Sequence, residues 1–196
     1  GKALDFSKKL PKHQKAAFTK KTGMVFQSFN LFPHKTALEN IMEGPVTVLK
    51  KSKAEACRDA IELLKRVGLE DKKDSYPHQL SGGMLQRIMI GIAMALQPEL
   101  LIADEPTTAL DVTVQRQILD LLKKIAEETH TAIVLVSHDL GVIASMCSRV
   151  LVMKEGRIVE EGSMEQIFYE PVHPYTKKLS DMARKLYQVP EKKRTG

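Results

Sequence analysis

Two adjacent carboxylates, Asp104 and Glu105, directly follow the apolar run at residues 100–103 (LLIA). An unbroken apolar run of this length is typical of a strand buried on both faces, as in a parallel sheet. Open α/β sheets bind ligands at the ends of such strands, and carboxylates are costly to bury there unless they hold a cation or transfer a proton. The sequence therefore predicts an acidic site of that kind. A solvated acidic pair on the surface is the alternative.

A second apolar run, at residues 132–136, predicts a second buried strand and ends in Ser137-His138-Asp139. The carboxyl ends of parallel strands meet at one edge of a sheet, so His138 is expected at the same edge as Asp104 and Glu105. A lone histidine is usually structural, but this position favours a functional one.

Two further stretches place polar groups at helix starts. Leu80-Ser81-Gly82-Gly83 precedes a helix predicted over residues 84–96. Small residues before a helix leave free N–H groups that, with the helix dipole, form an anion site. A plain N-cap turn is the alternative. Asp111 can cap the next helix, whose apolar stripe is Val114, Ile118, Leu121, Leu122 and Ile125.

The other elements must support these positions. A capping box at Ser52 and Glu55 predicts a helix that runs to Val67 and stops at Gly68. The remaining expectations are a strand over residues 23–26 ending at Gln27, an aromatic loop over 28–34, a helix near 37–42, a helix over 140–147, a hairpin of 150–153 with 157–160, and a short helix over 164–169.

Composition is ordinary for a soluble globular protein: 196 residues, 43% hydrophobic and 28% charged. No apolar run approaches the ~20 residues that cross a bilayer, and no signal-peptide pattern begins the chain, so a soluble intracellular protein is expected. Cys57 and Cys147 are the only cysteines, and both fall in helical patterns. Neither a disulfide framework nor a zinc site is expected.

The net charge of +6 is concentrated in residues 1–22, which hold seven lysines and one aspartate. A basic arm can bind nucleic acid, but this one has only Phe6 and Phe18 as aromatics and no recognition motif after it. A solvated segment, with short helical pieces around residues 12–21, is expected instead, and nucleic acid is not an expected partner.

Taken in order over residues 23–179, these pieces resemble the nucleotide-binding subunit of an ABC transporter of the importer type. Gln27 is similar to the Q-loop, Leu80-Ser81-Gly82-Gly83-Met84 to the signature motif, residues 100–105 to Walker B, Ala109-Leu110-Asp111 to the D-loop and His138 to the switch histidine. The resemblance implies an α/β fold: a P-loop NTPase-like (ABC ATPase) parallel-sheet core with a helical subdomain. Residues 36–96 would form that subdomain, 97–179 the rest of the core and 180–196 a basic tail.

The resemblance also implies ATP and Mg²⁺ as cofactors. Asp104, with Gln27 nearby, would bind Mg²⁺, which prefers oxygen ligands. Glu105 would polarise the water that attacks the γ-phosphate, and His138 would hold that phosphate. Ser81, Gly82 and Gly83 would grip the γ-phosphate of ATP bound to a partner subunit, and Asp111 would communicate across the dimer.

The implied partners are a second nucleotide-binding subunit, in a homo- or heterodimer, and transmembrane permease subunits. The loop at residues 29–34 and the helices after it would receive the permease's coupling helix, at the cytoplasmic face of the membrane. Residues 29–34 and 42–46 resemble importers of polar amino acids, whereas Met84 and residues 173–176 resemble the peptide and nickel class. A chimera and a divergent member of either class both account for this mixture.

One expected motif is absent from the sequence. No G-x-x-x-x-G-K-[ST] occurs upstream of Gln27, and Gly1-Lys2-Ala3 lacks the required Ser or Thr. We therefore expect an N-terminally truncated domain with an exposed sheet edge, which alone hydrolyses little ATP. The first hypothesis is an ATPase subunit of an amino-acid or peptide importer. The second is a non-catalytic module that lends its signature motif to a partner's ATP site. A nucleic-acid ATPase is disfavoured, because coiled-coil insertions and a second tandem domain are absent.

Overall fold

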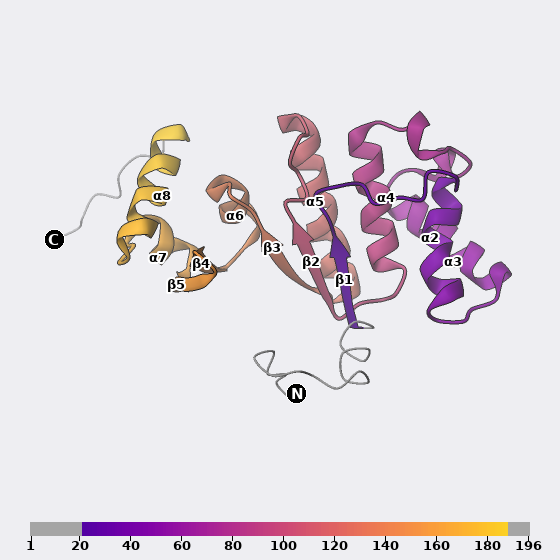
Figure 1. Ribbon diagram of the computed structural model, residues 1–196, viewed down its shortest axis with the longest axis horizontal. Coiled ribbons are helices and arrows are strands. Elements are labelled where there is room, and N and C mark those ends of the chain that lie inside the picture. The colour runs from indigo at the N-terminus through magenta and orange to yellow at the C-terminus, as the bar shows by residue number, and fades with distance from the viewer. Residues whose placement is uncertain (1–20, 188–196) are drawn as a thin grey trace. The chain divides into compact units, whose positions relative to one another are not determined.

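The computed structural model describes residues 21–187 (Figure 1). The chain divides into two compact units, Gly1–Val136 and Ser137–Gly196, and each is treated by itself. Apart from Lys21, the helical pieces expected around residues 12–21 lie outside the described residues, as does the end of the basic tail.

Unit 1 contains a parallel sheet of three strands, β1 (Thr22–Val25), β2 (Leu100–Asp104) and β3 (Ala132–Val136), in the order β1-β2-β3. The acidic strand β2 is therefore central, with a parallel neighbour on each side (Figure 1). Within the described residues β1 and β3 are the edge strands. The predicted parallel-sheet α/β core is confirmed.

Burial of the sheet differs between its two faces. Leu101 and Ala103 are buried, whereas Val134 and Val136 of β3 are 48% and 47% exposed. Successive strand residues point to opposite faces, and Val134 is in register with Ile102, so it shares the face opposite Leu101. The prediction that residues 132–136 form a buried strand is thus wrong for this unit, because an uninterrupted apolar run does not indicate which face is open.

The helical layer of unit 1 consists of α2 (Ala37–Thr47), α3 (Lys53–Arg66) and α4 (Gly82–Met94), with 3₁₀ turns η1 (Glu70–Lys72) and η2 (Pro77–Gln79) between the last two. Helices α2 and α3 pack on each other and on α4, and α4 also packs against β1 (Figure 1). Fully buried Ile41, Leu64 and Ile88 join the three helices. Ser52 caps α3, and Gly68 follows it with φ +71°, as predicted.

The boundaries of helices α2 and α4 differ from the sequence expectation, whereas the helix after Asp111 begins where it was predicted. Helix α2 continues five residues past 42, because the N–H of Val48 still reaches the carbonyl of Gly44 despite Pro45 inside the helix. Helix α4 begins at Gly82 rather than Met84, because Ser81 is its N-cap. Helix α5 (Val112–Thr129) is capped by Asp111 and buries the predicted residues Ile118, Leu121, Leu122 and Ile125.

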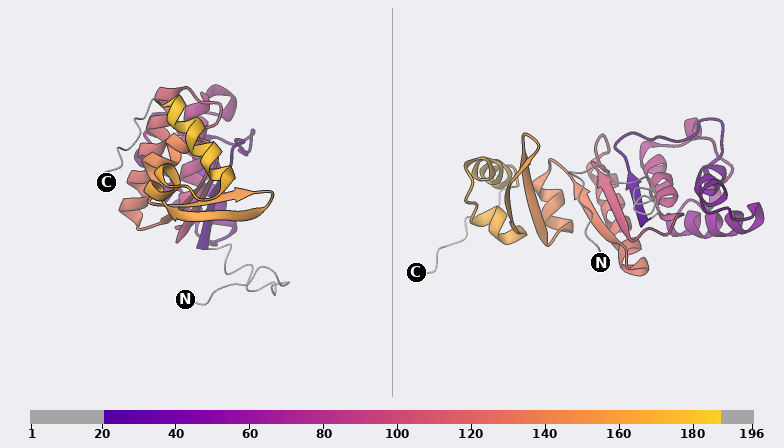
Figure 2. Two further views of the ribbon diagram at one scale, coloured as in Figure 1. Left: turned by 90° about the vertical axis from the view of Figure 1, so that its left-hand side faces the viewer. Right: turned by 60° about the horizontal axis from the view of Figure 1, so that its bottom comes forward.

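Unit 2 begins with α6 (Leu140–Met146), followed by an antiparallel hairpin of β4 (Arg149–Lys154) and β5 (Arg157–Ser163). Helices α7 (Met164–Tyr169) and α8 (Pro174–Leu186) complete it (Figure 2). Helix α7 packs on the hairpin and on α8, and α8 also packs on α6. The hairpin and the short helix match the sequence expectation, whereas the boundaries at 36–96, 97–179 and 180–196 remain predictions.

Candidate functional site

The register of the sheet places the predicted acidic residues beside the predicted glutamine. Val25 of β1 is paired with Ala103 of β2, and the strands are parallel. Gln27 and Glu105 each follow their paired residue by two positions, so both emerge at the same sheet edge. Asp104 is the last residue of β2 and is half-buried. The structure thus brings Gln27, Asp104 and Glu105 to one edge.

The turn after β2 holds Glu105 in an unusual conformation. Its φ is +45°, in the left-handed region that non-glycine residues rarely occupy. The amide of Glu105 donates to the carbonyl of Val136 at 2.9 Å, and the hydroxyl of Thr108 donates to its Oε2 at 2.8 Å. Strained backbone of this kind is concentrated at functional sites, where the surrounding structure maintains it. These bonds orient the carboxylate before any ligand binds.

The same turn continues into the start of α5. Ala109 also has a positive φ, of 66°, and Asp111 Oδ1 accepts from the amide of Val114 at 3.0 Å. The side-chain amide of Gln115 donates to the carbonyl of Thr107 at 3.2 Å, which ties the helix back to the turn. Asp111 Oδ1 therefore caps α5, which leaves Oδ2 for the contact with a partner subunit that the sequence predicts.

The turn before α4 has the features of an anion site. Ser81 is exposed and is the N-cap, and Gly82 and Gly83 are the first two residues of the helix. Their amides belong to the first turn, where N–H groups have no intrahelical acceptor, and the helix dipole adds positive potential. An anion such as phosphate is the ligand that this arrangement attracts.

The two glycines of this turn face neighbouring segments closely. A Cβ built on Gly83 would lie 2.6 Å from Cγ1 of Val114, so only glycine allows α4 and α5 to approach this closely. A Cβ on Gly82 would lie 3.4 Å from Leu110 and 3.7 Å from Phe29. The turn before α4 is therefore packed against the loop after β1 and against the start of α5.

The remaining predicted site residue, His138, belongs to unit 2. It is exposed and follows Val136, the last residue of β3, by two positions. The residue after it, Asp139, is the N-cap of α6. The structure thus places the predicted Gln27, Ser81, Gly82, Gly83, Asp104, Glu105 and Asp111 in unit 1 and His138 in the other unit.

Comparison with known proteins decides the family. The ABC transporter family profile matches residues 1–108. The chain is 47% identical over 177 residues to the L-cystine import ATP-binding protein TcyC of Bacillus subtilis, a match that covers 90% of this chain and 71% of that protein. The chain belongs to the ABC transporter family. It is an importer-type ATP-binding subunit, and members of this family bind ATP and are ATPases.

Two other ABC relatives extend the comparison. The oligopeptide transport ATP-binding protein AppD of Bacillus subtilis is 44% identical over 193 residues, which cover 91% of this chain but only 59% of AppD. The ATP-binding cassette MJ0796, solved as a dimer in a post-hydrolysis state with ADP and Pi, is 37% identical with a TM-score of 0.69. That match covers 79% of this chain and 68% of MJ0796. The chain thus spans about three fifths to seven tenths of these relatives.

Sequence reasoning missed a buried side chain that organises the aromatic loop of this ABC subunit. Asn40 on α2 is 2% exposed, and its Oδ1 accepts from the amide of Phe32 at 2.8 Å. Its Nδ2 donates to the carbonyls of Phe32, Lys35 and Thr36 at 3.2, 3.0 and 2.9 Å. The sequence signal that could have revealed this role is a polar residue on the buried side of α2, because a buried amide needs hydrogen-bond partners.

A second missed residue links α4 of this ABC subunit to the end of α3 and to α5. Arg87 on α4 donates from Nη1 to the carbonyl of Val67 at 3.1 Å, beyond the end of α3. It donates from Nη2 to Oε1 of Gln117 on α5 at 3.0 Å. These partners lie 20 and 30 residues from Arg87 in the sequence, so no local sequence pattern predicts the contacts. Helix α4 is thereby tied to the residue after α3 and to α5.

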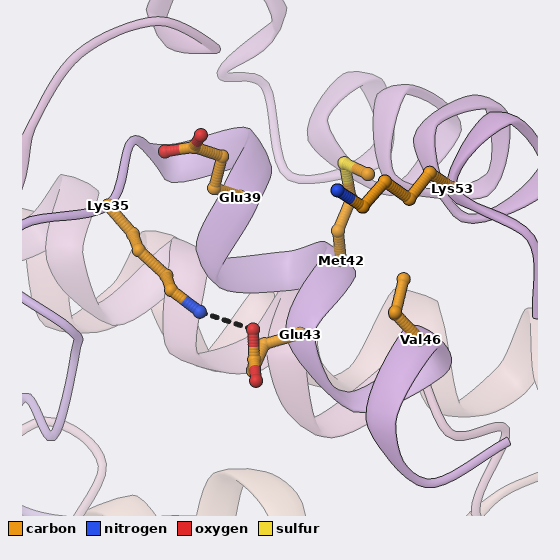
Figure 3. Close-up of a pocket in the computed structure, with 6 residues that line it drawn as sticks. All are labelled: Lys35, Glu39, Met42, Glu43, Val46 and Lys53. Carbon is orange, nitrogen blue, oxygen red and sulfur yellow. Dashed lines mark hydrogen bonds and ion pairs between the residues drawn. The ribbon is translucent and has the colours of Figure 1, made fainter. Parts of the chain in front are cut away.

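A shallow hollow of about 170 Å³ opens on the helical layer (Figure 3). Met42 and Val46 of α2 supply its apolar lining, and Lys53 enters from the start of α3. Charged Lys35 and Glu43 form an ion pair on its other side, where Glu39 also lies (Figure 3). Since Lys35 also lies over the Phe32 ring, at 4.8 Å from the centroid, the hollow adjoins the aromatic loop.

Oxygen ligands for a cation are few in this site. In the described part of the chain, no three His, Cys, Asp or Glu side chains gather as a metal site. A hard cation held by one carboxylate, one amide oxygen and the oxygens of a phosphate substrate fits the residues present, since Mg²⁺ is commonly bound in that way. The G-x-x-x-x-G-K-[ST] phosphate-binding sequence does not occur in the 196 residues.

Proposed function

We propose that this chain is the ATP-binding and ATP-hydrolysing subunit of an ABC importer for amino acids or peptides, and that it energises transport through a membrane permease. TcyC is named for L-cystine import and AppD for oligopeptide transport, which supports these two substrate classes. The observation that carries the proposal is the packing of the Gly82-Gly83 turn against Leu110 and Val114. It joins the anion-binding turn to the segment after the acidic strand end.

The hydrolytic roles fall to the edge where β1 and β2 end. Asp104 and Gln27 would hold Mg²⁺, which supplies positive charge against the phosphates. Glu105, oriented by Thr108, accepts a proton from the attacking water. His138, which follows the neighbouring strand β3, holds the γ-phosphate through a ring N–H donor.

The Ser81 turn binds a phosphate supplied by another subunit. Ser81 is exposed, and the first-turn amides of Gly82 and Gly83 are donors for an anion approaching along the helix axis. Asp111, at the N-cap of the next helix, would contact the same partner. A dimer with a second nucleotide-binding subunit is therefore part of the proposal, and MJ0796 was solved as a dimer.

A second candidate function follows from the exposed N-cap turn at Ser81, which would need only a partner's ATP. The chain would then be a non-catalytic module that completes an ATP site in trans. We expect negligible hydrolysis by the purified 196-residue polypeptide. Rapid turnover that is abolished by Glu105→Gln would contradict that expectation.

Mixing experiments test the trans role. The chain is added to a complete nucleotide-binding subunit, and ATP hydrolysis is measured with and without Ser81→Arg, whose bulky cation would block the anion turn. The matched control is Ser52→Arg, because Ser52 is likewise an exposed N-cap serine, on α3. We expect Ser81→Arg to abolish the change in the partner's rate and Ser52→Arg to preserve it. Equal rates with Ser81→Arg and the unaltered chain would refute the trans role.

The permease is proposed to dock on the hollow beside the aromatic loop, at the cytoplasmic face of the membrane. Within residues 21–187 no helix has the length and apolar character to cross a bilayer. The hollow offers an apolar floor between charged rims, which suits an amphipathic helix. Val46→Arg would fill it, whereas Thr47→Arg places the same group on the adjacent exposed residue. Co-purification with permease-containing membranes should fall at least about tenfold for Val46→Arg alone; equal recovery of both variants would exclude this docking site.

A further inference from the structure

The carboxylate of Asp139 joins two helices of unit 2. Its Oδ1 accepts hydrogen bonds from the amides of Gly141 and Val142, at 2.7 and 3.3 Å, and so caps α6. The same oxygen accepts from the hydroxyl of Tyr187 at 2.5 Å, and Tyr187 directly follows α8. An ordinary N-cap needs only the amide donors. The third donor therefore adds a link between the end of α8 and the start of α6.

The contact is shaped as well as hydrogen-bonded. A Cβ built on Gly141 would lie 2.5 Å from Cζ of Tyr187, so the tyrosine ring rests on bare backbone at the start of α6. The hydrogen bond to Asp139, together with partial burial and the nearby negative charge, raises the pKa of Tyr187 to about 12. The phenol is therefore a donor throughout the neutral range. Glycine at 141 and tyrosine at 187 form a fitted pair.

This pair acts on the backbone that carries His138. The amide of Asp139 donates to Oγ of Ser137 at 3.0 Å, and the carbonyl of Asp139 accepts from Ile143 in the first turn of α6. Both chain neighbours of His138 are thus held, one by its hydroxyl and the other by its side chain and carbonyl. Because His138 lies between Ser137 and Asp139 in the chain, a displacement of Asp139 moves His138 as well.

We propose that Tyr187 is a positioning residue for His138: through Asp139 and Gly141, the end of α8 sets the orientation of the imidazole. The proposal rests on the proposed function only for what His138 does, because the link itself lies within unit 2. It gives α8 a means of altering how His138 is presented. A ligand or partner that moved α8 would release the histidine without contacting it.

The first test removes only the hydroxyl. In the full chain, Tyr187→Phe should broaden or shift the His138 imidazole resonance, which is assigned from its loss in His138→Gln. It should also speed hydrogen exchange at the Gly141 and Val142 amides about tenfold, as expected for the loss of one charge-assisted bond. Tyr175→Phe deletes a hydroxyl from the same helix at a residue whose ring faces Lys154, and it should change neither readout. An unchanged His138 resonance in Tyr187→Phe would overturn the proposal.

The second test displaces the ring but keeps its hydroxyl. Gly141→Ala would normally favour a helix, yet here its Cβ must push Tyr187 away. It should reproduce the altered His138 resonance even if Tyr187→Phe proves too unstable to study. Gly141→Ala that leaves the resonance unchanged would show that Tyr187 has no hold on His138. These spectra need no ATP, so a failure of the ATP-binding or trans-activity tests would reject the corresponding function and leave the positioning role standing.

Discussion

The turn before α4 and the turn between β2 and α5 hold their polar groups in different ways. In the first, the bond from the Met84 amide to Ser81 is long, at 3.4 Å, and its glycines are fitted against Val114, Leu110 and Phe29 of other segments. In the second, the side chains bond within the turn itself: the Thr108 hydroxyl donates to Glu105 at 2.8 Å, and Asp111 accepts from the Val114 amide at 3.0 Å.

This difference fits the roles proposed for the two turns. A turn proposed to meet a partner's phosphate would depend on the position of the whole helix start, which packing among distant segments sets. A carboxylate proposed to orient water would depend on its own rotamer, which a neighbouring hydroxyl can set. Changes of shape should therefore impair the first turn strongly, and loss of single bonds should impair the second mildly.

The largest effect is expected at Asn40, whose hydrogen bonds hold the aromatic loop that packs against Gly82. Asn40→Leu keeps the branched shape but leaves the amide of Phe32 and the carbonyl of Lys35 without their Asn40 partner, while the carbonyl of Phe32 keeps the bond from the Lys35 amide. The free energy of unfolding should fall by about 3 kcal/mol, as buried groups lose their bonds. Urea titration followed by circular dichroism measures it. Asn30→Leu, on the exposed part of the same loop, should cost under about 0.5 kcal/mol. Equal losses for the two variants would show that the Asn40 hydrogen bonds do not support the loop.

The next effect tests the fitted glycine directly. Gly83→Ala forces its Cβ toward Val114 and should destabilise the fold by about 2 kcal/mol, a usual cost of overpacking. Val114→Ala removes the obstructing methyl groups. In that background Gly83→Ala should become neutral or slightly stabilising, because alanine is the better helix former. A double-mutant cycle with no coupling between the two sites would show that α4 and α5 adjust freely.

The sequence predicted the parts of this ABC subunit that depend on local chemistry. The apolar run of β2, the Ser52 and Asp111 caps and the stop at Gly68 are each encoded within a few neighbouring residues, and the structure confirms them. The bonds of Asn40 and the contact between Gly83 and Val114 join residues brought together only by tertiary packing. Exposure of Val134 was missed for the same reason, since a run without alternation cannot reveal an open face.

Loss of a single bond in the self-bonded turn should cost less. Thr108→Val keeps the shape of the side chain and removes the donor to Glu105 Oε2, which is half-buried and can partly recover a water partner. The free energy of unfolding should fall by about 1 kcal/mol. Thr113→Val, on the exposed first turn of α5, is the matched control and should change stability little. A loss as large as that of Gly83→Ala would erase the distinction between the two turns.

The smallest effect concerns Glu160 of β5, whose bonds to the segment before α8 carry charge and therefore depend on pH. Burial alone would raise the pKa of Glu160, but the amides of Val172 and His173, which donate to it at 2.7 and 3.0 Å, help to lower that pKa below its ordinary 4.5. The folded state thus binds this proton less readily than the unfolded chain does. The stability that Glu160 contributes is complete above pH 4.5 and is lost as the pH falls through the lower folded pKa.

Replacing the titrating group should flatten that acid limb. Melting temperatures of Glu160→Gln, recorded from about pH 6 down to pH 3, should fall less steeply than those of the unaltered chain. Glu155→Gln removes an equal charge from the exposed turn of the hairpin and should keep the original slope. If all three curves ran parallel, the charge of Glu160 would add nothing to the stability of this contact.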